Sequence, residues 1–442
     1  MKFSTLLAIV FTAAATASAQ DKMAGMSMTQ PSTLIDSQLQ HTSSGTSVQP
    51  PTTPVPMLMG QRAGWRIMLH SEAFVTDTQQ HANSGRGADK LFSTSWVMPM
   101  AQHPVGSRGL LTLRAMFSLE PGTVTGQYYP ELFQQGETAH GMPIVDGQHP
   151  HNLFMELGAL YDLRLGEHGL VSFYAAPVGD PAIGPTAYPH RESASEDPIA
   201  ALGHHQEDST HIAFNVLTLG LTYKTLRLEG SGFHGAEPTE ARWHFQPSPN
   251  GLAVDSYASR LTWAPTANVA AQYSIAEIKS PEALALNVNQ RRQTASVMYN
   301  RGFGLRQAMA GMSMPGDHPA TGNWSTTLLW GQTRASSTGA VENSYLLESL
   351  LQFRTRHYVW TRMEAAARTS ELLGRATSTG ESPAGHVQAY TAGYDRDFRV
   401  GRYVLAAPGA QFTVYRAPDS LVSTYGRTPF GAQAFVRFRL AR

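Results

Sequence analysis

Two copies of one hexapeptide carry the side chains best suited to metal chemistry. The sequence Met-Ala-Gly-Met-Ser-Met occupies residues 23–28 and again 309–314, where Asp317 and His318 follow closely. Thioether sulfur is a soft ligand that suits Cu(I), and neighbouring imidazole and carboxylate groups suit Cu(II). The alternative is that these methionines are inert parts of low-complexity stretches. The metal hypothesis assigns ligands to Met23, Met26, Met28, Met309, Met312, Met314 and His318.

Histidines form a second candidate group. Ten of the 17 lie between His140 and His244, most densely at 146–152 and 203–211. Imidazole with carboxylate suits divalent zinc, copper or nickel. The alternative is that these side chains anchor two long loops through hydrogen bonds, and both roles are compatible. The candidate ligands are His149, His151, His204, His205 and His211.

Other chemistry is poorly supported by the sequence. The absence of cysteine excludes thiolate metal sites and disulfides. No G-x-S-x-G nucleophile motif is present, and the closeness of Ser209 to His211 is expected by chance in a chain with this many serines and histidines. We therefore expect no enzyme. The 33 basic and 33 acidic residues balance, so there is no electrostatic footprint for nucleic acid.

The N-terminus predicts export. Lys2 precedes an apolar stretch that ends in Ala17-Ser18-Ala19, the pattern of a signal peptide covering residues 1–19. Residues 20–60 are rich in Ser, Thr, Gln and Pro, and such a composition buries too little apolar surface to offset chain entropy. We predict a disordered Met/Ser/Thr/Pro-rich tail over 20–60 and a folded unit over 61–442.

From Trp65 onward the sequence alternates with a period of two. Leu111, Leu113 and Ala115 share one face of a segment whose other face carries Thr112 and Arg114. About 16 such segments follow one another, and no stretch holds a helical period over three turns. Short connections alternate with long ones such as 120–151, 179–210 and 235–253, as in barrels with short periplasmic turns and long outer loops. The long 301–322 connection breaks this rule.

Charged residues gather on one face of these segments. Only 15% of the chain is charged, against about 25% in soluble domains. A charge on a lipid-facing strand position costs a few kcal/mol, roughly 2–4 at the midplane, so we place these residues in the lumen. The predicted fold is all-β, an antiparallel transmembrane β-barrel of about 16 strands with long outer loops. The predicted lumen residues are Arg114, Glu156, Arg164, Arg227, Glu229, Arg260, Arg362 and Glu364.

From Trp65 to the C-terminus the chain resembles bacterial outer-membrane β-barrel proteins, and its hexapeptides resemble the Met-rich stretches of the copper resistance protein B family. The resemblance implies a Gram-negative outer membrane, contact with its lipid and with the barrel-assembly machinery, a copper ion as cofactor or cargo, and a periplasmic metal-handling partner.

These observations lead to three functional hypotheses. The first is a barrel that handles or passes a small solute, with copper or another soft or borderline metal ion favoured. The second is a general or anion-preferring porin-like channel, suggested by the arginines, with incidental methionine motifs. The third is a surface scaffold or adhesion barrel that uses its long loops.

Overall fold

The computed structural model describes residues 31–208, 213–245, 253–282, 288–305, 320–374 and 382–440. Within these ranges, no helix combines the length and the apolar character that crossing a membrane requires. The predicted signal peptide and both hexapeptides lie outside the described residues, as do His211 and His318.

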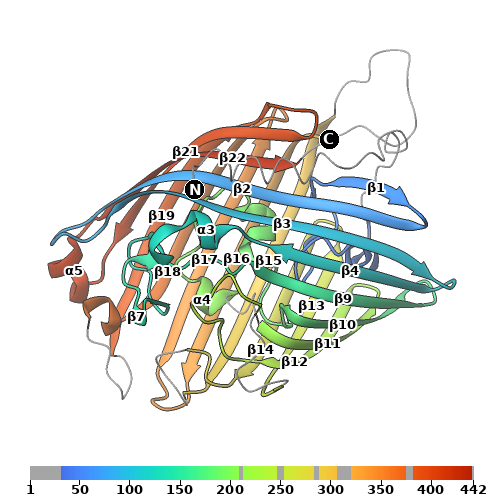
Figure 1. Cartoon of the computed structure of the whole chain (residues 1–442), viewed down its shortest axis with the longest axis horizontal. Coiled ribbons are helices and arrows are strands. Elements are labelled where there is room, and N and C mark those ends of the chain that lie inside the picture. Colours follow the sequence, from blue (N-terminus) through green and yellow to red (C-terminus); the bar gives the residue numbers. More distant parts are fainter. Residues whose placement is uncertain are drawn as a thin grey trace.

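Sixteen antiparallel strands form a closed barrel (Figure 1). The wall closes where Glu72–His81 of the first strand pair with Phe430–Arg439 of the last. The predicted all-β barrel is therefore confirmed. The wall strands are β2 (Trp65–His81), β3 (Asp89–Val105), β4 (Gly109–Phe117), β9 (Phe154–Leu165), β10 (Gly169–Gly179), β11 (Ala213–Tyr223), β12 (Leu226–His234), β13 (Ser256–Thr266), β14 (Val269–Ile278), β15 (Gln290–Leu305), β16 (Ala320–Ala335), β17 (Val341–Phe353), β18 (His357–Thr369), β19 (Pro383–Arg396), β21 (Val404–Arg416) and β22 (Phe430–Leu440).

Smaller elements complete the described chain. Two short strands pair with the end regions of wall strands: β1 (Leu58–Arg62) pairs with β2, and β20 (Phe398–Arg399) pairs with β21. Helix α2 (Leu34–Gln40) precedes the wall. The others lie in the connections: α3 (Glu120–Thr123), α4 (His204–Glu207), α5 (Asp419–Tyr425), the two-residue strands β5 (Tyr129–Pro130), β6 (Thr138–Ala139), β7 (Met142–Pro143) and β8 (Gly147–Gln148), and the 3₁₀ turns η2 (Thr125–Gln127), η3 (Tyr188–His190), η4 (Glu192–Ala194) and η6 (Ser370–Leu373).

The alternation of the sequence becomes an apolar outside and a polar inside. On β11, Leu217, Leu219 and Leu221 are 47–53% exposed, whereas Thr218 and Thr222 are buried. A soluble protein would bury the leucines instead, so this wall is built to meet lipid. Exposed aromatic residues lie near the strand ends, as in the interfacial girdles of outer-membrane barrels; they include Tyr223, Tyr257, Trp263, Trp324, Tyr345 and Tyr394.

The connections alternate in length as predicted, with two differences. The predicted loop 76–89 shrinks to 82–88, because the polar residues Thr76, Thr78 and Gln80 point inward and continue the pairing of β2 with β3. The irregular 301–322 connection is shortened by β15 and β16, which pair with each other as far as Leu305 and Ala320. Its remaining residues lie outside the described ranges.

The prediction of a disordered tail does not hold for residues 31–60. Residues 34–40 form α2, capped by the Thr33 side chain, and residues 41–57 run inside the barrel. The composition argument considered only what the segment can bury by itself. Here the barrel wall supplies hydrogen-bond partners that the segment lacks on its own, and these offset the cost of ordering it.

Buried charges tie the last strands of the wall together. Arg437 on β22 is fully buried and lies 3.1 Å from both Asp395 and Asp397 and 3.8 Å from Glu72. It also forms an ion pair with Glu196, which belongs to a connection inside the barrel. One guanidinium therefore joins the strand that closes the barrel to its neighbours and to its contents.

We expect Arg437→Met to destabilise the barrel strongly, because it leaves Asp395 and Glu72 buried without this cation, while Glu196 and Asp397 keep their pairs with Arg439. Removing one partner of a buried ion pair costs about 3–5 kcal/mol. The control is Arg291→Met, which removes an exposed pair with Glu277 and should cost about 0–1 kcal/mol. Urea unfolding in lipid vesicles, followed by tryptophan fluorescence, measures both; equal effects would contradict this account of the network.

Candidate functional site: the filled lumen

The eight residues predicted for the lumen all lie on inward faces of the wall. Seven are buried in ion pairs, and Arg164 is partly exposed. Arg114 forms two parallel hydrogen bonds with Glu156, at 2.7 and 2.9 Å. Each of the five arginines predicted for the lumen is therefore matched by a carboxylate. The pairs are Arg114–Glu156, Arg227–Glu229, Arg260–Glu229, Arg362–Glu364, Arg362–Asp197 and Arg164–Asp36.

Residues 31–57, the luminal N-terminal segment, are held by backbone carbonyls that accept hydrogen bonds from the wall. Arg114 donates to the carbonyls of His41, Ser43 and Gly45 at 3.0, 2.6 and 2.5 Å. Gly45 has a φ of 58°, and a Cβ added there would lie 2.5 Å from the Cβ of Asp180. Glycine is therefore required where this segment passes so closely over another one.

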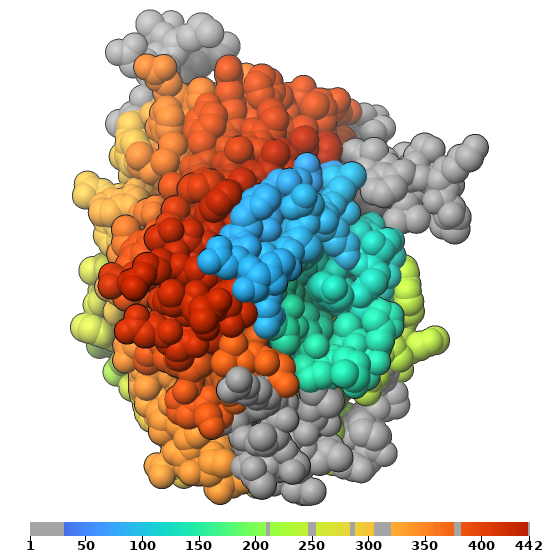
Figure 2. All heavy atoms as spheres, turned by 90° about the vertical axis from the view of Figure 1, so that its left-hand side faces the viewer, coloured from blue at the N-terminus to red at the C-terminus, as the bar shows by residue number. Residues whose placement is uncertain are grey.

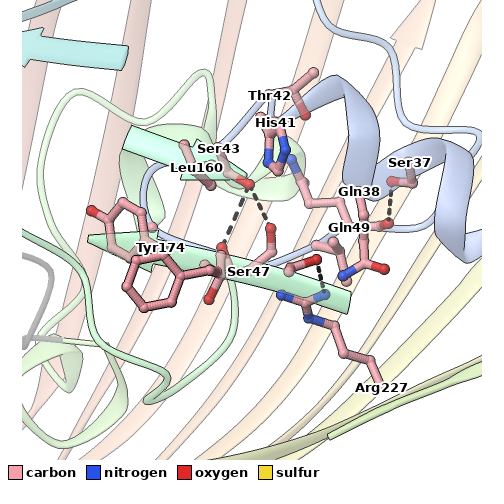
Figure 3. Close-up of a pocket in the computed structure, with 15 residues that line it drawn as sticks. Ser37, Gln38, His41, Thr42, Ser43, Ser47, Gln49, Leu160, Tyr174 and Arg227 are labelled. Atoms are coloured by element: carbon pink, nitrogen blue, oxygen red, sulfur yellow. Dashed lines mark hydrogen bonds between the residues drawn. The ribbon is translucent and has the colours of Figure 1, made fainter. Parts of the chain in front are cut away.

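Helix α2 places further polar side chains against the wall (Figure 3). Gln38 hydrogen-bonds with Thr222 at 2.6 Å, and His41 lies 2.6 Å from Asp162. In Figure 3, Arg227 rises from the wall toward Gln38 and Gln49 of the segment. These contacts are hydrogen bonds and ion pairs, so the interface between segment and wall is largely polar, with apolar contacts at Leu34, Val48 and Met57.

The second inner connection, residues 180–208 between β10 and β11, also fills the lumen. Arg191 on this connection lies 2.5 Å from Glu348 of β17 and 2.9 Å from Asp208. From the wall, Arg362 donates to the carbonyls of Ile199 and Ala200 at 3.0 and 2.9 Å. Its described part includes α4, which lies against β15, β16 and β17 (Figure 1).

The first inner connection, residues 118–153 between β4 and β9, closes the end of the barrel that carries the long loops. Figure 2 shows its teal residues packed beside the blue residues of β2 and β3. Leu132 and Phe133 form an apolar cluster with Tyr415 and Tyr425. Arg86 holds Asp146 at 2.9 Å. The long loops that we predicted at 120–151 and 179–210 therefore fold into the lumen, the second as far as residue 208, where its described part ends.

Burial of the inward side chains shows that this lumen is filled. Thr112, Asp162, Thr294 and Arg437 come from strands all around the wall and are each 0% exposed. In a water-filled pore such inward residues would be wet. Among the described residues, three inner segments thus close the barrel: the luminal N-terminal segment and the first and second inner connections. We call these three segments the plug.

Three predicted histidines meet inside this plug. One nitrogen from each of His149, His204 and His205 lies within 4.8 Å of the others. The sequence had placed them in two separate groups. The carboxylate of Glu137 adds a fourth group, 3.0 Å from His149 and 3.7 Å from His205. Three imidazoles and a carboxylate form a donor set suited to zinc or Cu(II).

Burial and mutual pairing shift the pKa values of two groups in this cluster. Burial lowers the pKa of His205 to about 4, so its imidazole is neutral near pH 7. Burial opposes ionisation of Glu137, but His149 and His205 outweigh it and lower the pKa of that carboxyl to about 2. A neutral imidazole and an ionised carboxylate are the forms that ligate metals.

The other predicted ligands are placed elsewhere or not described. His151 forms its own pair with Glu120, at 2.9 Å. The hexapeptide methionines, His211 and His318 lie outside the described residues. Glu137 was missed because it stands alone in sequence, twelve residues before His149.

A buried methionine cluster was also missed. It joins Met57, Met68, Met98, Met100, Met116 and Met155, with Met59 packed against it. The signal was present: Met68, Met98, Met100 and Met116 occupy inward positions, where the rest of the wall carries mainly polar residues.

Comparison with solved structures supports the fold. An anion-selective porin from Comamonas acidovorans aligns with a TM-score of 0.50 and 10% identity, over 85% of this chain and 99% of the porin. The fold is that of a bacterial porin. OmpT, an outer-membrane protein of Vibrio cholerae, gives 0.46 and 7% over 86% of this chain and 99% of OmpT. No protein-family model matches the sequence, and neither does any curated protein.

We expect Arg114→Met to loosen the luminal N-terminal segment. The substitution removes three hydrogen bonds to its carbonyls and leaves Glu156 without its cation. Hydrogen bonds to charged groups contribute about 1.5–3 kcal/mol each, so amides of residues 41–47 should exchange with deuterium more than about tenfold faster.

The control is Arg164→Met, which removes a half-exposed pair with Asp36 at 3.3 Å. It should change exchange little, because exposed pairs contribute about 0–1 kcal/mol. Unchanged exchange in Arg114→Met would show that other contacts hold the segment.

Proposed function

We propose that the protein is a porin-like outer-membrane barrel that passes a small polar solute when its inner segments move. The observation that carries this proposal is the pairing of a closed, lipid-facing wall with a polar interior. The porin fold supports the same function.

The nature of the plug explains how such a channel would be closed at rest. The luminal N-terminal segment and the second inner connection are held mainly by side-chain hydrogen bonds and ion pairs, such as those of Arg114 and Arg191. Water can replace such contacts at modest net cost, whereas it cannot replace an apolar core. Displacement of these segments would therefore open a path without unfolding the wall.

The paired charges of the lumen favour a channel that discriminates only weakly between anions and cations. Arg114, Arg227, Arg260 and Arg362 each lie within 3.0 Å of a carboxylate oxygen. Their positive charge is compensated locally, so arginine content alone does not make the interior attractive to anions. We propose a channel with little selectivity for charge.

Planar-bilayer recordings test this function. The full-length barrel should conduct rarely and in brief events, whereas a variant lacking residues 31–57 should show long open events of higher conductance. Under a salt gradient, its reversal potential should stay near zero. The control is Arg291→Met, which breaks an exposed pair with Glu277 and leaves the inner segments intact.

A deletion variant that folds, as shown by its resistance to SDS before heating, but never conducts would refute the channel. Such a result would favour the scaffold alternative.

We also propose metal-ion handling at the histidine cluster, because His149, His204, His205 and Glu137 meet inside the plug. These residues belong to both inner connections, so an ion bound there would stabilise the closed arrangement. Copper stays our favoured cargo among the borderline metals that this donor set suits.

We expect the double substitution His149→Ala and His205→Ala to weaken binding of Zn(II) or Cu(II) by at least about 100-fold, since two of four donors are lost. Isothermal titration of the detergent-solubilised barrel measures it. His140→Ala, at an exposed histidine of the same connection, is the matched control. Equal affinities in all three proteins would rule out this site.

A further inference from the structure

Methionine sulfur is concentrated in one part of the barrel wall. Of the ten methionines among the described residues, six form the buried cluster and Met59 packs against it. The other three, Met142, Met298 and Met363, lie elsewhere. No other part of the described wall gathers sulfur in this way.

Strand register brings these side chains face to face. Met59 of β1 pairs with Met68 of β2, and Met68 pairs with Met100 of β3, so three methionines stand in one row across three strands. Side chains directly opposite each other have Cβ atoms about 4.5–5.5 Å apart. Met98 pairs in the same way with His70. Met59, at one end of this row, is partly buried, whereas Met68 and Met100 are buried.

Two histidines complete the cluster from the wall and from the plug. The Nε2 atom of His190, on the second inner connection, lies 3.3 Å from the sulfur of Met116. The rings of His70 and His190 have centroids 5.9 Å apart, and both pack on Trp96. The Nδ1 atoms of both histidines are buried and have no hydrogen-bond partner.

Apolar packing alone does not account for this arrangement. Leucine fills such volumes equally well, and burial of imidazole nitrogens without partners is costly. A ligand that accepts both thioether sulfur and imidazole nitrogen would account for the methionines and for the approach of His190 Nε2 to the sulfur of Met116. Soft monovalent cations have this preference, because thioethers bind Cu(I) and imidazole is a common copper ligand.

We propose that the methionine cluster, with His70 and His190, binds a soft monovalent cation, Cu(I), within the barrel. Met116 and His190 supply the central sulfur and nitrogen donors, and Met98 and Met68 supply further sulfurs. All these ligands are uncharged, so the bound site keeps the single charge of the ion. Binding involves no electron transfer. The proposal does not depend on conduction by the barrel or on the separate histidine cluster.

The proposed Cu(I) site is in direct contact with the plug. Gln49 of the luminal N-terminal segment donates to the carbonyl of His190 at 2.7 Å, and Met57 of the same segment belongs to the cluster. A cation held between Met116 on the wall and His190 on the plug would join the two. Bound Cu(I) should therefore strengthen closure as well as mark a path for the ion.

The test measures how much Cu(I) the full-length protein binds in detergent, under oxygen-free conditions and in competition with the chelator bicinchoninate. The same measurement is then made with Ag(I), which is redox-inert. The cluster variant replaces Met68, Met98 and Met116 by Leu, a volume-conserving change that cores tolerate well. The matched control replaces Met142, Met298 and Met363 by Leu. A third variant replaces the six hexapeptide methionines by Ser.

We expect the cluster variant to lose about one tightly bound Cu(I), with affinity at least about tenfold weaker at that site. The matched control and the hexapeptide variant should keep this ion, and X-ray absorption should show its sulfur neighbours. Retention of the ion with the same sulfur neighbours in a folded cluster variant would overturn the proposal. Loss of all Cu(I) in the hexapeptide variant would overturn it too, since binding would then belong to the hexapeptides.

Discussion

The structure depends on polar partners for the charged side chains that face inward. The wall must present apolar side chains to lipid, so alternation sends the polar and charged side chains of each strand into the lumen. In a wide pore these groups would be hydrated. Here they are dry, and the inner segments supply the partners that water would otherwise provide. Arg114, Arg191 and Arg362 show the pattern, since each joins a wall strand to a segment inside.

This constraint explains how much of the fold follows from the sequence. Residues such as Leu217, Thr218 and Leu219 alternate clearly enough to predict a strand and its lipid-facing side. The strand number and the alternation of short and long connections follow from the same pattern. The order of residues 31–57 could not be predicted in this way. Its cause is a set of donors, Arg114 foremost, that lie some 70 residues away in the sequence.

The candidate sites were predictable only in part, for the same reason. His149 and His204 stand out as members of dense groups, but their meeting depends on how two long connections fold toward each other. Met68 and Met100 stand alone in the sequence, and their contact comes from the register between β2 and β3. Residue type can suggest ligands, whereas their convergence is a property of strand pairing and of the plug.

The position of the luminal N-terminal segment has a consequence for biogenesis. It precedes β2, and β2 forms the seam with β22, the last strand of the chain. The segment precedes all sixteen wall strands and is thus enclosed when the last of them completes the wall. If the seam closes before the segment is inside, the wall already surrounds an unfilled space whose arginines and carboxylates lack their inner partners. Closure and filling must therefore be coordinated in time, with Arg437 and Glu196 joining seam and contents at the final step.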